Sequence, residues 1–117
     1  MKRILVLDDE KDNAYLFALI LEDHGYVVDT YTNPIKALAE FKAGCYDLMI
    51  LDYRMAKLNG PEFFQKIRVL DKSAKAIILT AGHEQLHLDD DHKLFLKVLG
   101  KPISAKTLLK EVALVIG

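Results

Sequence analysis

Four short polar segments hold the residues that could do chemistry in this sequence, and each follows an apolar run. Asp8 and Asp9 follow the first run, and Asp52 follows the third. Thr80 follows the fourth run, and Lys101 follows the fifth. Carboxylate oxygens favour a hard cation such as Mg²⁺ over zinc. An amine and a hydroxyl are donors that suit phosphate oxygens. The set therefore predicts a site that handles a phosphoryl group together with a metal ion.

Electrostatics limits how such a cluster can exist. Three carboxylates a few Å apart repel by about 4 kcal/mol per pair at an effective dielectric near 20. A whole domain is stable by only roughly 5–15 kcal/mol. The cluster must therefore be spread apart, partly protonated or neutralised by Lys101 and a divalent ion. In that setting Asp52 is a candidate nucleophile that forms an aspartyl-phosphate, with cations and the Thr80 hydroxyl stabilising the transferring oxygens.

Apolar periodicity predicts five strands that alternate with five helices. The expected strands span residues 4–7, 26–31, 48–51, 76–79 and 95–99. The expected helices cover 11–24, begin after Asn33, Asn59 and Ser104, and include a weak candidate over 83–92; the helix after Asn33 should end at Gly44. This alternation favours a doubly wound α/β sheet, and short right-handed crossovers make that sheet parallel. Ligands of such sheets bind beyond the carboxyl ends of the strands, so the four polar segments should converge there.

Apolar residues at helical spacing mark the faces of the first three helices that should turn to the core. They are Leu16, Phe17, Ile20 and Leu21 on the first, Ile35, Leu38, Ala39 and Phe41 on the second, and Phe63, Phe64, Ile67 and Leu70 on the third.

Length and composition exclude several classes of protein. The 117 residues are 51% hydrophobic and fit a single domain over 1–117. A formal net charge of -1 gives no basic excess for direct binding of nucleic acid. Cys45 is the only cysteine, which excludes an internal disulfide, and we expect it to be buried or half-buried. The first apolar run is too short for a signal peptide or membrane span, so we expect a cytoplasmic protein without membrane insertion.

Four motifs resemble those of the receiver domain of two-component response regulators, over residues 2–116. The motifs are Leu7-Asp8-Asp9-Glu10, Leu51-Asp52 with Met55 and Gly60, Thr80-Ala81, and Lys101-Pro102. One motif alone is weak, but four in order at predicted strand ends form a specific pattern. The resemblance implies a flavodoxin-like fold with five parallel strands in the order 2-1-3-4-5 and five helices.

The same resemblance implies a role for each acid. The aspartate at Asp52 accepts phosphate from a phosphohistidine of a histidine kinase or histidine phosphotransfer protein. Asp9 and Asp52 bind Mg²⁺ (or Mn²⁺) directly, and Asp8 does so largely through water. The backbone carbonyl of Arg54 supplies a further ligand.

The resemblance also covers the phosphoryl contacts, which fall to Thr80 and to the lysine of a cis Lys101-Pro102 bond. Ala56 departs from the family by replacing its usual proline. Val98 replaces the usual aromatic switch residue, so an output need not use an aromatic rotamer flip. Gly82 has no side chain to position an attacking water, so we expect slow self-dephosphorylation.

Several functions remain open at this stage. The leading ones are a conformational switch acting on a downstream protein and a phosphate shuttle within a relay, as a monomer or a weak dimer. A Mg²⁺-dependent phosphatase commonly carries a second acid two residues after its nucleophile, where this chain has Arg54. A pseudo-receiver that serves only as an interaction module is disfavoured by the complete set of polar residues. A nucleotide-binding flavodoxin-like protein would need a glycine-rich loop after the first strand.

Simpler interpretations of single residues also remain open. Asp8 and Asp9 could cap the first helix, and His83 and His87 could hold a transition metal. Apolar residues expected to lie off the buried helix faces could form a docking patch for a histidine-bearing partner. They are Tyr15, Leu19, Leu109 and Ile116.

Overall fold

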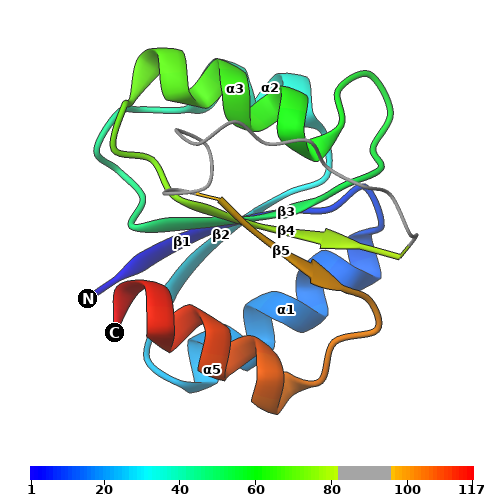
Figure 1. Ribbon diagram of the computed structural model, residues 1–117, viewed down its shortest axis with the longest axis vertical. Helices are drawn as coiled ribbons and strands as arrows, with labels where there is room; N and C mark the ends of the chain where they lie inside the picture. The colour runs from blue at the N-terminus through cyan, green and yellow to red at the C-terminus, as the bar shows by residue number, and fades with distance from the viewer. Residues whose placement is uncertain (82–95) are drawn as a thin grey trace.

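Five parallel strands form one sheet in the order β2-β1-β3-β4-β5 (Figure 1). This computed structural model describes residues 1–81 and 96–117. The strands are β1 Arg3–Leu7, β2 Val27–Tyr31, β3 Leu48–Asp52, β4 Ala76–Thr80 and β5 Leu96–Gly100. The parallel register aligns Leu7 with Leu51 and Thr80 with Gly100, so the strand ends meet at one edge. The strand order predicted from the sequence is confirmed.

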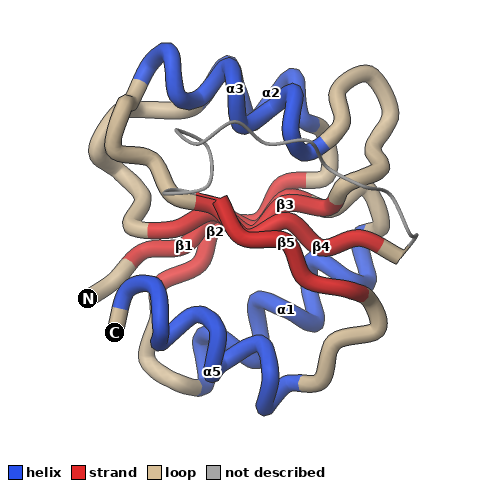
Figure 2. The backbone as a smooth tube through the Cα atoms, viewed as in Figure 1, coloured by secondary structure: helices blue, strands red, loops and turns tan. Residues whose placement is uncertain are grey.

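Helices cover both faces of the sheet (Figure 2). They are α1 Lys11–Asp23, α2 Pro34–Glu40, α3 Gly60–Leu70 and α5 Ala105–Ile116. Helices α1 and α5 lie on one face, and α2 and α3 lie on the other (Figure 1). The helix expected over 83–92, together with Gly82 and the histidine pair, lies outside the described residues. Within the described residues, no helix has the length and apolarity that a membrane span requires.

Three predicted helix starts are confirmed by side-chain caps. Asn33 Oδ1 accepts hydrogen bonds from the backbone of Ile35 and Lys36. Asn59 accepts from Glu62 N at 2.8 Å, and the Glu62 carboxylate accepts from Asn59 N at 3.0 Å. Ser104 caps α5 in the same way. These caps satisfy donors that helix ends leave unpaired, so they fix where each helix begins.

Strands β3 and β4 carry the two halves of the core, one on each face. Leu51 and Ile78 pack with α2 and α3. Ile50 and Ile77 pack with α1 and α5. All four side chains are at most 1% exposed. Because both faces of these central strands are covered, their sequences are continuous apolar runs, and the polar residues that follow them are confined to the ends.

The buried face of α1 differs from the expected one. Leu16 was expected to be buried, but it is 54% exposed. The buried residues of this helix are Ala14, Phe17, Ala18 and Leu21. Small alanines allow this helix to approach the sheet closely, so the contact face is centred away from the larger Leu16 side chain. Apolar spacing alone therefore did not identify which side of α1 packs against the sheet.

Burial predictions around α2 and α3 were also partly wrong. Ile35 and Leu70 are 45% and 54% exposed, and Ala39 is exposed as well. Helix α2 ends at Glu40 rather than at Gly44 because the backbone becomes extended at Phe41. The Phe41 ring stacks on Tyr46 at a centroid distance of 6.2 Å. These two rings supply the apolar contact of the loop, and Cys45 is exposed rather than buried.

Candidate functional site

Three carboxylates meet at the carboxyl ends of β1 and β3. One oxygen each from Asp8, Asp9 and Asp52 lies within 4.8 Å of the other two. The pairing of Leu7 with Leu51 brings the residues that follow these strands together. Asp8 is only 2% exposed, Asp52 is half-buried and Asp9 is exposed. The negative charge of the cluster is therefore only partly solvated by water.

The amine of Lys101 lies between two of these acids. Its Nζ is 3.2 Å from Asp8 Oδ2 and 3.1 Å from Asp52 Oδ1. The backbone positions the lysine, because Lys101 N donates a 2.7 Å hydrogen bond to Thr80 O. The Lys101-Pro102 peptide bond is cis, as the resemblance to receiver domains implies. One cation thus reaches both strand ends from the far side of β4.

The loop after β1 holds Asp8 by hydrogen bonds of its own. Asp8 Oδ1 accepts from Glu10 N at 2.9 Å, and Asp8 N donates to Tyr31 O at 3.1 Å. The N-cap residue of α1 is Glu10, and no side chain caps this helix. Capping of α1 therefore does not account for Asp8 and Asp9, and the second oxygen of Asp8 faces Lys101.

Burial and neighbouring charges shift the proton affinity of this cluster. Burial raises the pKa of Asp52, and the charges of Asp8 and Asp9 act in the same direction against the hydrogen bond from Lys101. Burial would lower the pKa of Lys101, but its hydrogen bond to Asp52 and the charges of both acids outweigh this and raise it. Lys101 therefore stays charged, while ionised Asp52 is less stable than an exposed carboxylate.

Oxygen ligands of this kind fit a hard divalent cation. The donor set consists of carboxylates alone, which favours Mg²⁺ or Mn²⁺ over softer metals. Asp9 is exposed, so waters can complete a coordination shell, as Mg²⁺ usually requires. A single lysine balances only one of the three negative charges. The residues present therefore fit the metal ion expected from the sequence.

Thr80 and Arg54 flank the cluster. Thr80 is the last residue of β4 and is 7% exposed. Arg54 is exposed, two residues after Asp52. Two backbone hydrogen bonds fix Tyr53, the residue between Asp52 and Arg54. Tyr53 N donates to Leu79 O, and Gly60 N donates to Tyr53 O. The loop after β3 is thereby tied to both β4 and α3.

Gly60 is a positioning residue whose steric role the sequence did not reveal. A Cβ atom at this position would lie 2.7 Å from the backbone oxygen of Asp52. Such a distance is shorter than van der Waals contact allows, so only glycine lets α3 approach this strand end. The turn signal in Asn59-Gly60-Pro61 predicted a helix start, but a steric contact with a residue eight positions earlier is visible only in three dimensions.

Residues 4–113 match the family model described as the response regulator receiver domain. The chain belongs to this family. It is 33% identical over 115 residues to a response regulator receiver protein of Anaeromyxobacter sp. (strain Fw109-5), an alignment that covers 93% of this chain and 46% of that protein. It is 36% identical over 73 residues to hybrid signal transduction histidine kinase B of Dictyostelium discoideum, covering 62% of this chain and 4% of that protein. The chain thus spans less than half the length of these curated relatives.

Solved structures of receiver proteins share this fold. The response regulator TrrA of Thermotoga maritima, solved in complex with Mg(2+)-BeF, superposes with a TM-score of 0.84 at 36% identity, covering 98% of this chain and 99% of that one. TrrA in complex with the histidine kinase ThkA gives a TM-score of 0.83 at the same identity, over 100% of both chains. The chain is a receiver domain of two-component signal transduction.

We predict that Gly60→Ala lowers the free energy of unfolding by about 1–3 kcal/mol, the usual cost of overpacking. The new methyl group would collide with the Asp52 carbonyl. Gly100→Ala is the matched control, because a Cβ there meets nothing within 4 Å. Urea denaturation followed by circular dichroism measures both. Equal effects of the two substitutions would contradict the steric role of Gly60.

We predict that Lys101→Met in buffer without divalent cations lowers the free energy of unfolding by about 3 kcal/mol, because it leaves the Asp8 carboxylate buried without a cation. Adding Asp8→Asn to Lys101→Met should restore part of the loss, since no unpaired buried charge then remains. Urea denaturation of Lys101→Met, of Asp8→Asn and of the double variant gives the free energies of unfolding for a double-mutant cycle. A loss that Asp8→Asn does not reduce would show that Lys101 stabilises the fold through packing only.

Proposed function

We propose that Asp52 is the phosphoacceptor of this receiver domain. The observation that carries the proposal is the position of its carboxylate, 3.1 Å from the Lys101 amine and within the cluster of Asp8 and Asp9. A carboxylate oxygen of Asp52 attacks the phosphorus of a phosphohistidine, an acyl phosphate bond forms, and the phosphorus–nitrogen bond breaks. The leaving imidazole takes up a proton.

Asp8, Asp9, Asp52 and the backbone carbonyl of Arg54 would hold Mg²⁺ or Mn²⁺ in this proposal. The ion would offset the negative charge of the phosphoryl oxygens and of the acids themselves. Lys101 keeps a positive charge at the acceptor, because the hydrogen bond to Asp52 and the charges of Asp8 and Asp52 together outweigh the effect of burial on its pKa. The Thr80 hydroxyl at the end of β4 would donate to a phosphoryl oxygen.

The proposed donor is a histidine kinase or a histidine phosphotransfer protein. TrrA, to which this chain is similar, was solved in complex with the histidine kinase ThkA. In this chain a groove of about 490 Å³ reaches Lys101 between α1 and the segment after β5. Its lining residues are Asn13, Leu16, Phe17, Ala81, Lys101, Pro102 and Ile103. A helix that carries the phosphohistidine would bring its imidazole to Asp52 along this groove.

The exposed apolar residues of α1 only partly match the expected docking patch. Tyr15 and Leu19 are 63% and 46% exposed, as expected, and Leu16 joins them. Leu109 and Ile116 are half-buried against the α1/α5 face of the core, so they contribute little. The proposed docking surface is therefore centred on α1 rather than on the last helix.

The same proposal covers the remaining properties of the chain. Residues 1–117 form one phosphorylatable domain that works in the cytoplasm as a conformational switch for a protein target or as a shuttle in a relay. Receiver domains are not multiple-turnover enzymes in the usual sense, and this one catalyses only its own phosphorylation and slow dephosphorylation. The exposed cation at Arg54, in place of a second acid, disfavours turnover as a phosphatase.

We predict that Mg²⁺ and a small acyl phosphate convert the protein stoichiometrically to a species heavier by one phosphoryl group. Asp52→Asn should abolish the adduct. Asp12→Asn, which removes an exposed acid of α1 outside the cluster, should leave it intact. Intact-protein mass spectrometry reads the result, and removal of the metal with EDTA should suppress the reaction.

Other outcomes of this experiment separate the alternatives. Rapid release of phosphate over many turnovers would show that the protein is a phosphatase and not a switch or shuttle. The absence of any adduct in Mg²⁺ would leave an interaction module. Loss of the adduct within seconds would contradict slow self-dephosphorylation.

A further inference from the structure

A second crevice lies beside the acidic cluster, at the carboxyl end of β2. The chain turns to α1 after β1, but after β2 and β3 it turns to α2 and α3 on the opposite face (Figure 1). Crevices form where the connections of neighbouring parallel strands run to opposite faces. Because β1 lies between β2 and β3, two such places flank its end. The acidic cluster occupies one of them.

The other place is a pocket of about 410 Å³ between α1 and α2. This volume lies within the range of about 300–1,000 Å³ that is usual for small-molecule sites. Lys11 and Tyr15 line it from α1, and Lys36 lines it from α2. Thr30 and Thr32 add hydroxyl groups from the end of β2 and the loop that follows it. The walls therefore combine two cations, hydrogen-bond donors and two aromatic rings, those of Tyr31 and of Tyr15, which is 63% exposed.

The positive charge of this pocket is not balanced by its own walls. No acidic side chain lines it, and neither Lys11 nor Lys36 forms an ion pair with another residue that the structure describes. Lys11 is also the first residue of α1, where the helix macrodipole repels a cation. An anion bound there would offset both contributions.

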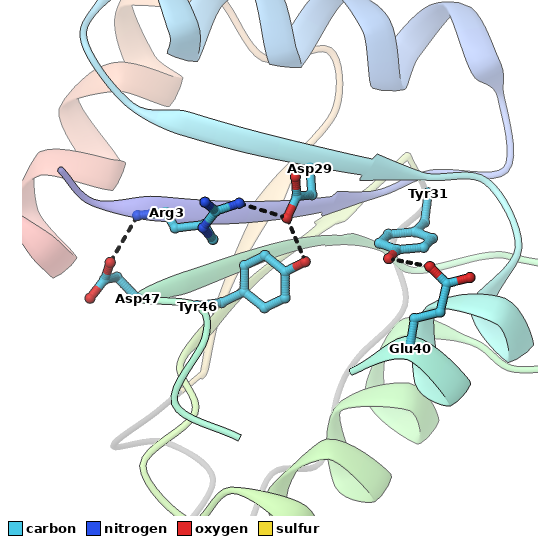
Figure 3. A network of polar contacts seen from close by, with 6 residues as sticks. All are labelled: Arg3, Asp29, Tyr31, Glu40, Tyr46 and Asp47. Carbon is cyan, nitrogen blue, oxygen red and sulfur yellow. Dashed lines mark hydrogen bonds and ion pairs between the residues drawn. The ribbon is translucent and has the colours of Figure 1, made fainter. Parts of the chain in front are cut away.

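Two acids of the neighbouring elements, Asp29 and Glu40, already accept hydrogen bonds from other side chains, as Figure 3 shows. Asp29 of β2 accepts from Arg3 at 3.1 Å and from Tyr46 at 2.8 Å. Glu40 at the end of α2 accepts from the Tyr31 hydroxyl at 2.9 Å. Asp29 is therefore held by partners outside the pocket, whereas Glu40 is held by the hydroxyl of Tyr31, a residue that lines the pocket.

Asp9 belongs to the surface that adjoins this region. It lines a smaller adjoining pocket of about 190 Å³ that shares Thr32 and Asn33 with the larger one. Asn33 Oδ1 already accepts from the backbone of α2, which leaves its amide group as a donor. The smaller pocket is thus lined by both Asp9 and Lys57, whereas the larger one is lined by Lys11 and Lys36 and by no acid.

We propose that this pocket binds a small organic phosphate of mononucleotide size. Lys11 and Lys36 hold the phosphate, and Tyr15 contacts the aromatic part of the molecule. The binding site is separate from the phosphoacceptor cluster and needs neither a metal ion nor Asp52. Occupancy would place a ligand next to the loop that carries Asp9 and against Tyr15, a residue that also belongs to the proposed docking surface on α1.

Titration with AMP in EDTA-containing buffer, followed by ¹⁵N NMR, tests this proposal. Saturable shifts should concentrate at residues 11–15 and 30–36. Lys11→Gln with Lys36→Gln should weaken AMP binding by at least about tenfold, because two charge-assisted contacts are lost. Lys66→Gln with Lys75→Gln removes the same net charge from exposed positions elsewhere and should change nothing. Asp52→Asn should bind AMP as the unaltered protein does, which separates this site from the proposed phosphorylation.

Two further probes define the ligand class. Inorganic phosphate should bind more weakly than AMP, and adenosine should not bind. Tyr15→Ala should weaken AMP binding without affecting phosphate. Adenosine binding equal to that of AMP, phosphate binding as tight as that of AMP, indifference to both lysines, or no saturable shift with AMP would each overturn the proposal.

Discussion

The structure depends on balancing one buried carboxylate. Asp8 is 2% exposed, and its partner Lys101 comes from the opposite end of the chain. A buried charge without a cation costs several kcal/mol, which is a large part of the stability of a small domain. The ion pair therefore links the first strand to the segment after the last strand. The same amine contacts Asp52, so the lysine that neutralises Asp8 also lies against the proposed phosphoacceptor.

Lys101 does not neutralise all of the negative charge of the cluster, and the remaining negative charge favours binding of a cation. Three acids face one amine, and the pKa of Asp52 is raised chiefly by burial. A site with unbalanced negative charge attracts a divalent cation, and the cation in turn makes the site tolerant of a phosphoryl group. Fold stability and the proposed phosphoryl chemistry thus depend on the same few side chains. The register of β1, β3, β4 and β5 is what brings them together.

Much of this arrangement could be predicted from the sequence because each element carried a local signal. Continuous apolar runs marked strands buried on both faces, and asparagine or serine marked helix starts at Asn33, Asn59 and Ser104. Polar residues after those runs had to meet at one edge, since parallel strands end together. The motif pattern then supplied the strand order.

The features that were missed depend on contacts between distant residues. Leu16 and Ile35 were expected in the core from their apolar spacing, but the approach of each helix to the sheet decides which side chains are covered. Cys45 is exposed because Phe41 and Tyr46 pack in its place. The collision that restricts position 60 to glycine and the cationic pocket beside β2 involve segments whose proximity no local pattern encodes.

A crystal structure of the protein with Mg²⁺ and beryllofluoride, a mimic of the phosphoryl group, tests the central claim most directly. The account predicts the mimic on the Asp52 carboxylate, the metal on the oxygens of Asp9 and Asp52, and the Lys101 amine against the fluorides. A mimic bound to another side chain, or a Lys101 amine directed away from Asp52, would contradict it.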